Sequence, residues 1–510
     1  MDRHKAMRQA LRDTPASTPD ALFKLGVQAV NAGLFEPVRD RFAAEVAGAR
    51  NNDARFWQVL GLAQRGLQDS ASAHAAFTRA GALAPTDPLI AHSLARTALE
   101  AGYPATPLFD HARALAPADG SVLLGRAAAQ HAEGDTAQAR ADLVEILQAN
   151  PGWLDGHACY ARLTATVAPD DDIAGTLRAA LARFPRQADL WATLIRLHNE
   201  AGAFEQALAA AEQARAAAGP SAQLALLEGT ALNEAGRAEQ ALAVFTSLPP
   251  DSAATTRLHR IRALIRLRRF DQALALAESH GPDEADMWPY RALLWRLTGD
   301  ARWRWIEGDD RLVSVHDLAD RIDLTRLSEV LRSIHRGTGR PLDQSVRGGT
   351  QTDGNLLARA EPEIRFLRKA LMSAVEDHVA QLPSPVAGHP TLLGTRAPLR
   401  VAGSWSVRLD GQGFHVDHVH QQGWLSSALY VALPEGPAGI DRTGGNHEGW
   451  LALGENRALL PEVEGFRLIE PKAGRLVIFP STMWHGTRPF GAGERLTVAF
   501  DIAPPIQESA

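Results

Sequence analysis

The apolar positions of this chain follow two different rhythms. Up to about residue 300 the sequence is rich in Ala and Leu and poor in β-branched residues, and this composition favours helix. Beyond Thr391, short runs of Val, Leu, Ile, Phe and Trp alternate with turns rich in Gly and Pro, a pattern typical of strands. The change of rhythm predicts a helical N-terminal part and a β-rich C-terminal part.

The helical part repeats itself with a period of 34 residues. The segment 202–208 (GAFEQAL) recurs 34 residues later as 236–242 (GRAEQAL). Prolines recur every 32 to 35 residues, at Pro85, Pro117, Pro151, Pro185 and Pro220. Because proline ends a helix and small residues let two helices approach closely, each repeat is predicted to be a helix pair. The pattern resembles the tetratricopeptide repeat, which implies a superhelix that binds extended peptides or partner proteins, or that only scaffolds the part that follows.

Seven short strands are predicted in the C-terminal part, where Gly and Pro separate them. They cover 404–409, 415–420, 425–433, 467–470, 475–479, 482–485 and 495–502. Strands of this length and spacing are typical of a sandwich or jelly roll. Two amphipathic stretches before them flank the polar segment 347–352, which is predicted to be a loop whose paired glycines let it approach a ligand closely.

The chain is therefore predicted to be a multidomain α + β protein. An all-α array resembling tetratricopeptide repeats covers 20–305, a helical lead-in covers 306–395, and a jelly-roll core, or double-stranded β-helix, covers 396–506. The sequence does not indicate an oligomeric state.

Composition and charge exclude several classes of protein. The 53 Lys and Arg residues against 59 Asp and Glu residues give a net charge of −6, which argues against a nucleic-acid partner. A single cysteine, Cys159, excludes an internal disulfide and a zinc site built from several cysteines. No run reaches the roughly 18 apolar residues of a membrane span, and the first residues lack the apolar core of a signal peptide, so we expect a cytoplasmic protein with no membrane partner.

Histidines and one aspartate gather at the predicted strand 415–420. Because alternate residues of a strand share a face, His415 and Asp417 can converge on one ion, and so can His418 and His420. The two pairs have opposite parity, so a regular strand presents only one of them to the interior unless a bulge intervenes. A further histidine, His485, lies near the end of the strand region. Imidazole and carboxylate ligands of this kind suit a metal such as Fe(II).

An arginine follows His485 by ten residues. Arg495 and Thr497 share one face of the last predicted strand. A guanidinium inside a barrel requires an anion, and a carboxylate matches its fork. The anion is either a bound carboxylate or a neighbour in the chain, Glu494 or Asp501.

Taken together, these motifs resemble those of the 2-oxoglutarate/iron(II)-dependent oxygenases. The resemblance is carried by the double-histidine strand, the aromatic strand 426–431, the segment 474–480, and His485 followed by Arg495. More narrowly, the chain resembles a bacterial group in which tetratricopeptide repeats precede the oxygenase domain. The resemblance covers roughly residues 340 to 505.

This resemblance implies roles for individual residues. His485 corresponds to the distal metal ligand and Arg495 to the residue that binds 2-oxoglutarate, with Thr497 and Tyr430 as hydrogen-bonding companions. Most of the superfamily has a His-x-Asp pair, which His415 and Asp417 match. The narrower group has His-x-His, which favours His418 and His420, and we prefer this pair. Arg347 and Gln351 are expected to line the substrate pocket.

The activity implied is hydroxylation of a substrate with Fe(II), 2-oxoglutarate and O2, and with ascorbate as reductant. A peptide or protein side chain docked with help of the repeats is the preferred substrate, and a small molecule is the alternative. Two other classes fit the sequence: a non-catalytic adaptor with a degenerate metal site, and a cupin-like metal enzyme that does not use 2-oxoglutarate. Arg495 argues against the cupin-like enzyme, because its guanidinium suits the far carboxylate of 2-oxoglutarate.

Overall fold

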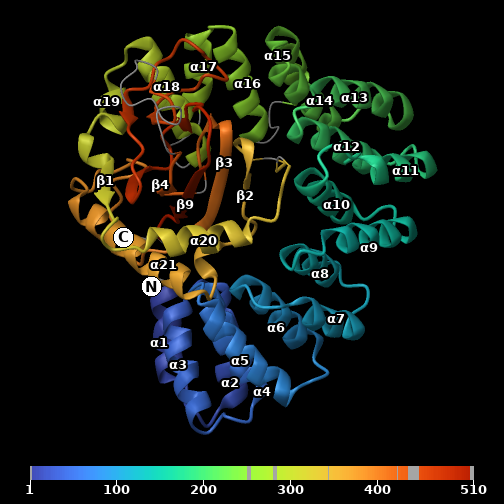
Figure 1. Ribbon diagram of the computed structural model, residues 1–510, viewed down its shortest axis with the longest axis vertical. Helices are drawn as coiled ribbons and strands as arrows, with labels where there is room; N and C mark the ends of the chain where they lie inside the picture. The colour runs from blue at the N-terminus through green and yellow to red at the C-terminus, as the bar shows by residue number, and fades with distance from the viewer. Residues whose placement is uncertain are drawn as a thin grey trace. The chain divides into compact units, whose positions relative to one another are not determined.

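The structure, a computed structural model, describes residues 3–249, 254–279, 284–339, 341–342, 344–421, 423–434 and 447–505. The described residues form two compact units, and Figure 1 labels their helices and several of their strands. Unit 1 contains the residues up to Ala139 together with Asp353–Met372, and unit 2 contains Arg140–Thr352 and Ser373–Pro505. Helices α9 (Thr136–Ala149) and α21 (Pro362–Gln381) contribute to both units.

Unit 1 is built from consecutive helices that pack on one another. They are α1 (Arg3–Asp13), α2 (Pro19–Asn31), α3 (Phe35–Ala47), α4 (Ala54–Gly66), α5 (Ser70–Leu83), α6 (Pro88–Ala101), α7 (Thr106–Leu115) and α8 (Gly120–Ala132). Aspartates cap the N-termini of α4, α5, α6 and α8 by accepting backbone N–H groups of the first turn. The predicted helix pairs are therefore present, and they begin with an additional helix, α1.

A phenylalanine that packs on a glycine recurs through the array. A Cβ atom on Gly26 would lie 2.4 Å from the ring of Phe42, so only glycine leaves room for that ring. The same arrangement recurs in both units, at Gly61–Phe77, Gly125–Phe109 and Gly229–Phe245. The members of each pair stand 16 residues apart on neighbouring helices. At these four pairs glycine lets the two neighbouring helices approach closely.

The helices of unit 2 continue the array and then flank the strands. They are α10 (Leu154–Val167), α11 (Gly175–Arg183), α12 (Ala188–Glu200), α13 (Phe204–Ala218), α14 (Ala222–Glu234), α15 (Ala238–Ser247), α16 (Ala254–Arg266), α17 (Phe270–Glu278), α18 (Trp288–Thr298), α19 (Arg302–Glu307) and α20 (Leu324–Ile334). Helix α20 contacts the central strand β4.

The strands form one antiparallel half-barrel sheet with the order β1-β7-β4-β9-β3-β8-β5-β6, and β2 pairs with β3. The strands are β1 (Ser314–Asp317), β2 (Val346–Gln351), β3 (Val401–His418), β4 (Leu425–Ala432), β5 (Leu451–Leu453), β6 (Arg467–Ile469), β7 (Arg475–Pro480), β8 (His485–Thr487) and β9 (Arg495–Ile502). The predicted jelly-roll class is confirmed, whereas β1, β2 and β5 were not predicted as strands.

Strand β3 is the longest strand of this sheet and pairs with three others, β2, β8 and β9. Its first half pairs with β9 and its last residues pair with β8, so one continuous strand serves both neighbours. The sequence predicts two strands here, separated at the glycines near residue 412. That prediction is wrong, because Gly411 and Gly413 lie inside β3, where Gln412 has a positive φ of 71° and the chain bends without leaving the sheet.

The prediction of a loop at 347–352 is also wrong, because most of this segment forms strand β2. Its glycines approach β3 rather than a ligand: a Cβ atom on Gly349 would lie 2.3 Å from the carbonyl oxygen of Arg408. Gly348 has φ +68° beside Gly413, at a shift in the β2–β3 register. The paired glycines are thus explained by close strand packing at a bulge.

The last repeat helices share a hydrophobic core with the segment before β8. The indole of Trp484 packs edge-on against Tyr290 of α18, with ring centroids 5.4 Å apart, and donates a hydrogen bond to the carbonyl of Pro289. Leu459 and Leu460 join the same core together with Ile261 of α16. Helices α16 and α18 therefore support the stretch of chain that leads into His485.

Candidate metal centre

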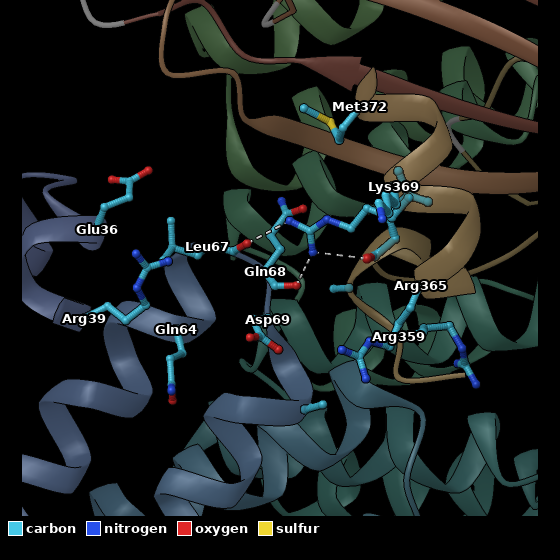
Figure 2. A pocket seen from close by; sticks show the side chains of 14 residues that line it. Glu36, Arg39, Gln64, Leu67, Gln68, Asp69, Arg359, Arg365, Lys369 and Met372 are labelled. Carbon is cyan, nitrogen blue, oxygen red and sulfur yellow. Dashed lines mark hydrogen bonds between the residues drawn. The ribbon is translucent and has the colours of Figure 1, made fainter. Parts of the chain in front are cut away.

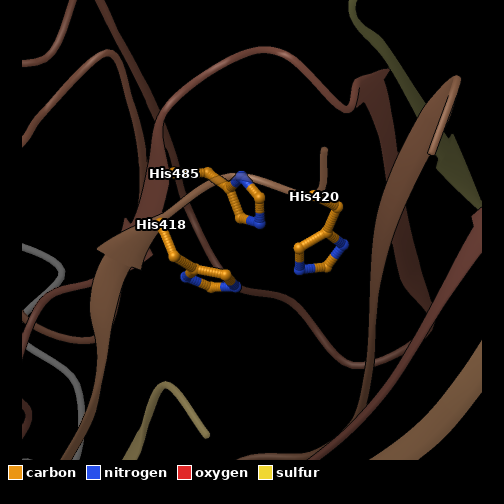
Figure 3. A group of neighbouring side chains, drawn as sticks. All are labelled: His418, His420 and His485. Atoms are coloured by element: carbon orange, nitrogen blue, oxygen red, sulfur yellow. The ribbon is translucent and has the colours of Figure 1, made fainter. Parts of the chain in front are cut away.

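Three histidines meet where β3 ends and β8 begins. His418 is the last residue of β3 and pairs in register with His485, the first residue of β8, while His420 follows two residues after β3 ends. The ring centroid of His418 lies 4.3 Å from that of His485 and 4.9 Å from that of His420. One ring nitrogen of each histidine lies within 4.8 Å of the others, and Figure 3 shows the rings turned toward a common space.

In each of these rings, Nδ1 is committed to an oxygen of the protein. Nδ1 of His418 donates to the carbonyl of Val416 at 2.7 Å, and Nδ1 of His485 donates to the carbonyl of Met483 at 2.9 Å. Nδ1 of His420 lies 2.7 Å from a carboxylate oxygen of Asp501. Since these partners accept, Nδ1 carries the proton and Nε2 keeps its lone pair. Three oriented Nε2 atoms are a donor set that fits a metal ion.

Burial keeps these rings ready to bind. Removal from water lowers the pKa of His418 to about 4, and the neighbouring ring of His420 adds to the effect. Burial also holds the pKa of His485 well below its ordinary value, with His418 contributing. Both imidazoles are therefore neutral at pH 7, and a metal does not have to displace a proton from either ring.

The other predicted pair, His415 and Asp417, is divided between different partners. The carboxylate of Asp417 accepts the side-chain Nε–H and the backbone N–H of Arg457, at 2.9 and 2.8 Å. The ring of His415 stacks 6.2 Å from His418, and its Nδ1 lies 3.1 Å from the hydroxyl of Ser345. Among the described residues, the histidine group above is the one that brings three candidate ligands together.

A bulge explains this division. Between His415 and His418 strand β3 advances three residues, while β8 advances two, from Thr487 to His485. In a regular strand His415 and His418, three residues apart, would point to opposite faces. The extra residue of the bulge brings them to the same face, so the alternation assumed in the sequence analysis does not hold here. His415 consequently lies beside His418, and Asp417 points to Arg457.

Arg495 lies buried near this group with unused hydrogen-bonding capacity. It is 2% exposed, and its guanidinium donates to the carbonyl of Gly449 at 2.7 Å and to the hydroxyl of Thr487 at 3.3 Å, while its Nε has no hydrogen-bond partner among the described residues. Thr487 and His485 are alternate residues of β8, so they share one face of that strand. Burial lowers the pKa of Arg495, which marks the cost of the uncompensated charge.

Tyr430 and Thr497 surround the same guanidinium. The guanidinium carbon of Arg495 lies 4.9 Å from the ring centroid of Tyr430, which pairs in register with Thr497 on β9. The hydroxyl of Tyr430 is buried and has no hydrogen-bond partner among the described residues, and burial raises its pKa. The hydroxyl of Thr497 makes a long, 3.4 Å contact with the carbonyl of Val407. Both hydroxyls can therefore serve a ligand that Arg495 attracts.

Neither carboxylate that the sequence offered to Arg495 pairs with it. Glu494 binds Arg332 and Arg408, at 2.8 and 2.6 Å, and Asp501 binds His420. Asp501 is the functional residue that sequence reasoning misplaced, since nothing in the spacing of 81 residues between Asp501 and His420 indicates their contact. The hydroxyl of Ser426 also donates to Asp501, at 2.7 Å.

The predicted pocket residues Arg347 and Gln351 both lie on β2. They pair in register with Phe414 and Val407 of β3. Arg347 donates to the backbone carbonyl of Gln344 at 2.7 Å, and the side-chain amide of Gln351 donates to the side chain of the same residue at 3.2 Å. Their predicted role in substrate binding stays a prediction.

Comparison with known proteins agrees with this geometry. Residues 403–501 match the family model described as "Putative 2OG-Fe(II) oxygenase". No curated protein sequence matches the chain.

Three solved structures illustrate the partial structural likenesses. A tetratricopeptide repeat protein from Parabacteroides merdae is 18% identical (TM-score 0.31; 48% of this chain and 98% of that chain covered). A Pseudomonas putida prolyl-4-hydroxylase is 18% identical (0.26; 38% and 94%), and yeast Tom70 is 15% identical (0.35; 57% and 61%). Likenesses of this size say nothing about substrate.

The family match spans the three histidines together with Arg495 and Asp501. Residues 403–501 thus resemble the family described as putative 2OG-Fe(II) oxygenases, and a tetratricopeptide-like array of helix pairs precedes them in the chain.

Proposed function

We propose that the protein is a 2-oxoglutarate- and Fe(II)-dependent hydroxylase. The observation that carries the proposal is a buried arginine without a carboxylate partner among the described residues, beside three imidazoles whose Nε2 atoms face one another. Neither group is satisfied by the chain itself, and a dicarboxylate that binds a metal at one end satisfies both.

In this proposal the chain's residues have distinct roles. His418, His420 and His485 would hold the iron, and Asp501 orients the ring of His420 through Nδ1. Arg495 binds the far carboxylate of 2-oxoglutarate. When bound, iron and 2-oxoglutarate together activate O2, so that one oxygen atom enters succinate as CO2 leaves and the other becomes the hydroxyl of the product.

Tyr430 and Thr497 complete the carboxylate pocket. Their hydroxyls donate to the same carboxylate that Arg495 binds, and the buried surroundings keep water away from it.

For the substrate we propose a peptide or protein side chain that docks with help of the helical array, because stacked helix pairs present an extended binding surface. A small-molecule substrate is the alternative, and in that case the array assembles or stabilises the protein. The division at 20–305, 306–395 and 396–506 stays a working proposal. In the described part of the chain no helix is long and apolar enough to cross a membrane, and the cytoplasmic location stays a prediction.

Binding and turnover of 2-oxoglutarate test the proposal. The full chain is loaded anaerobically with Fe(II), titrated with 2-oxoglutarate in a calorimeter, and then given O2 and ascorbate while succinate is measured. Arg495→Ala is expected to weaken 2-oxoglutarate binding by roughly 10²-fold, since truncating one partner of a buried charge pair costs about 2–5 kcal/mol. Arg467→Ala, on the edge strand β6, serves as the matched control.

Fe(II) binding must survive in the Arg495→Ala variant, so a loss confined to 2-oxoglutarate distinguishes a binding defect from misfolding. Wild-type protein that binds neither Fe(II) nor 2-oxoglutarate would instead identify a non-catalytic adaptor. Wild-type protein that binds Fe(II) but ignores 2-oxoglutarate would favour a metal enzyme of another class.

A further inference from the structure

A cavity of about 500 Å³ lies in unit 1, far along the chain from the histidine group. One wall comes from α3, the end of α4 and the start of α5, and the other from the segment 357–372 that contains the first half of α21. Figure 2 shows Arg39 on the first wall and Arg359, Arg365 and Lys369 on the second.

The cavity is strongly cationic. Five of its lining side chains are Arg or Lys, against two carboxylates, Glu36 and Asp69. Arg39 and Arg359 are already paired with Asp40 and Glu361, which leaves the cations of α21. Asp69 is already used, because it caps α5 by accepting the backbone N–H of Ser72 at 3.2 Å. The net charge of the lining is therefore positive in a chain whose overall charge is −6.

Three of the cations lie on one face of α21, at positions 365, 368 and 369. Of these, Arg365 lies at the end of the first turn, where the helix dipole favours acidic side chains over cations. Arg365 and Lys369 are exposed, and neither has an ion-pair partner among the described residues. Arg365 and Lys369 are therefore free to pair with an anion from outside.

Arg368 has a structural role instead. Its guanidinium donates to the carbonyl of Leu67 at 2.9 Å and to the carbonyl of Gln68 at 2.5 Å, which caps the C-terminal end of α4. These bonds hold the two walls of the cavity together. The cavity is thus preformed, and its free cations stand on a supported helix.

The lining distinguishes between possible anions. No aromatic side chain lines the cavity, so it lacks the stacking platforms on which single-stranded nucleic acids depend. Leu67, Leu357 and Met372 provide apolar contacts between the charges. Guanidinium and ammonium groups interspersed with apolar side chains suit a peptide in which acidic and aliphatic residues alternate.

We propose that this cavity is a docking site for an acidic peptide segment of a partner protein, with Arg365 and Lys369 pairing its carboxylates. The site is independent of the proposed oxygenase activity, because its binding involves no residue of the metal centre.

Fluorescence anisotropy of the full chain with a labelled Glu-Glu-Leu-Glu-Glu-Leu peptide tests the proposal. Saturable binding is expected, weakening by roughly tenfold or more in Arg365→Glu/Lys369→Glu and on raising salt from 50 to 200 mM, because charge pairs at an exposed site are screened. Lys24→Glu/Arg113→Glu, an equal charge change on exposed residues of α2 and α7, is expected to leave the affinity within twofold.

His485→Ala should bind the peptide like the wild type, so the result does not depend on the metal centre. Circular dichroism establishes that each variant is folded. The proposal is overturned if no saturable binding occurs, if both double variants weaken binding equally, or if a single-stranded oligonucleotide of equal charge binds more tightly at the same residues.

Discussion

Two clusters of polar side chains start from neighbouring residues of β3, Asp417 and His418, and they differ in whether the chain itself satisfies them. The paired cluster consists of Asp417, Glu455, Arg457 and Arg488, in which each carboxylate faces a guanidinium. The open cluster consists of His418, His420, His485 and Arg495. One ring nitrogen of each histidine lies within 4.8 Å of the others, and the guanidinium Nε has no partner among the described residues.

The difference shows what burial of polar groups means in each case. A buried charge with a partner from the chain contributes to a defined structure, because breaking the pair would leave an uncompensated charge. A buried group without a partner costs free energy unless a ligand supplies the missing interaction. The paired cluster is therefore expected to support stability, and the open cluster to support binding. The following predictions test this division, beginning with the largest effect.

Removing one imidazole from the open cluster should abolish metal binding. His485→Ala leaves two candidate ligands, and the number of Fe(II) or Co(II) ions bound per chain, measured by anaerobic calorimetry, should fall from one to near zero. His316→Ala, a histidine of edge strand β1, is the control. Full-affinity binding by His485→Ala would show that the ligand set is different, and His415→Ala would then be examined.

Breaking the paired cluster should reduce the free energy of unfolding and leave metal affinity unchanged. Asp417→Asn removes the charge that Arg457 faces, and we expect the free energy of unfolding to fall by about 2–4 kcal/mol, since Asp417 is buried while Arg457 is partly exposed. Denaturant unfolding measures this change. Metal affinity should stay within twofold of the wild type. A collapse of metal affinity with unchanged stability would make Asp417 a ligand.

Asp501 combines features of both clusters. It is a carboxylate of the chain, and it pairs with His420, a ring of the open cluster. Asp501→Asn should weaken metal binding by about 10–100-fold while the protein stays folded, as expected when the carboxylate behind a metal-binding imidazole is lost. Ser426→Ala, which removes a donor to Asp501, should weaken binding less, and Ser427→Ala, whose hydroxyl donates to the carbonyl of Phe500, should not. Equal effects of both serine variants would contradict this role.

His335 is a paired imidazole, and it predicts a modest pH dependence of stability. Its nitrogens lie 2.8 Å from the hydroxyl of Thr350 and 3.1 Å from that of Ser406, and burial lowers its pKa to about 4. Below a pH of about 6.5, His335 becomes protonated in the unfolded chain but stays neutral in the folded chain. The free energy of unfolding therefore decreases as the pH falls.

This contribution of His335 to the free energy of unfolding should decrease by about 1 kcal/mol between pH 7.5 and pH 5.5. Denaturant unfolding of the wild type and of His335→Gln at both pH values measures it, and the variant should show a weaker dependence. An identical pH dependence in both proteins would mean that His335 does not contribute.

The sequence predicted the class of the fold and several members of the open cluster for identifiable reasons. Helix pairs were predictable because segments such as 202–208 and 236–242 repeat at a fixed spacing along the chain. The buried position of Arg495 follows from its place in an apolar strand. The paired glycines of β2 led to the wrong prediction of a ligand-binding loop. Glycine is required there because β3, and not a ligand, lies close to the backbone.

By itself, the sequence determined a repeating helical array, a strand-rich C-terminal part, and a supply of imidazoles and one guanidinium in the latter, since these depend on composition and local periodicity. The tertiary structure alone decided which side chains meet. One extra residue in β3 sends Asp417 to Arg457, the sheet brings Asp501 to His420, and the fold of unit 1 sets Arg39 across a cavity from Arg365. Such pairings depend on strand register and on segments remote in sequence, and local patterns carry no record of either.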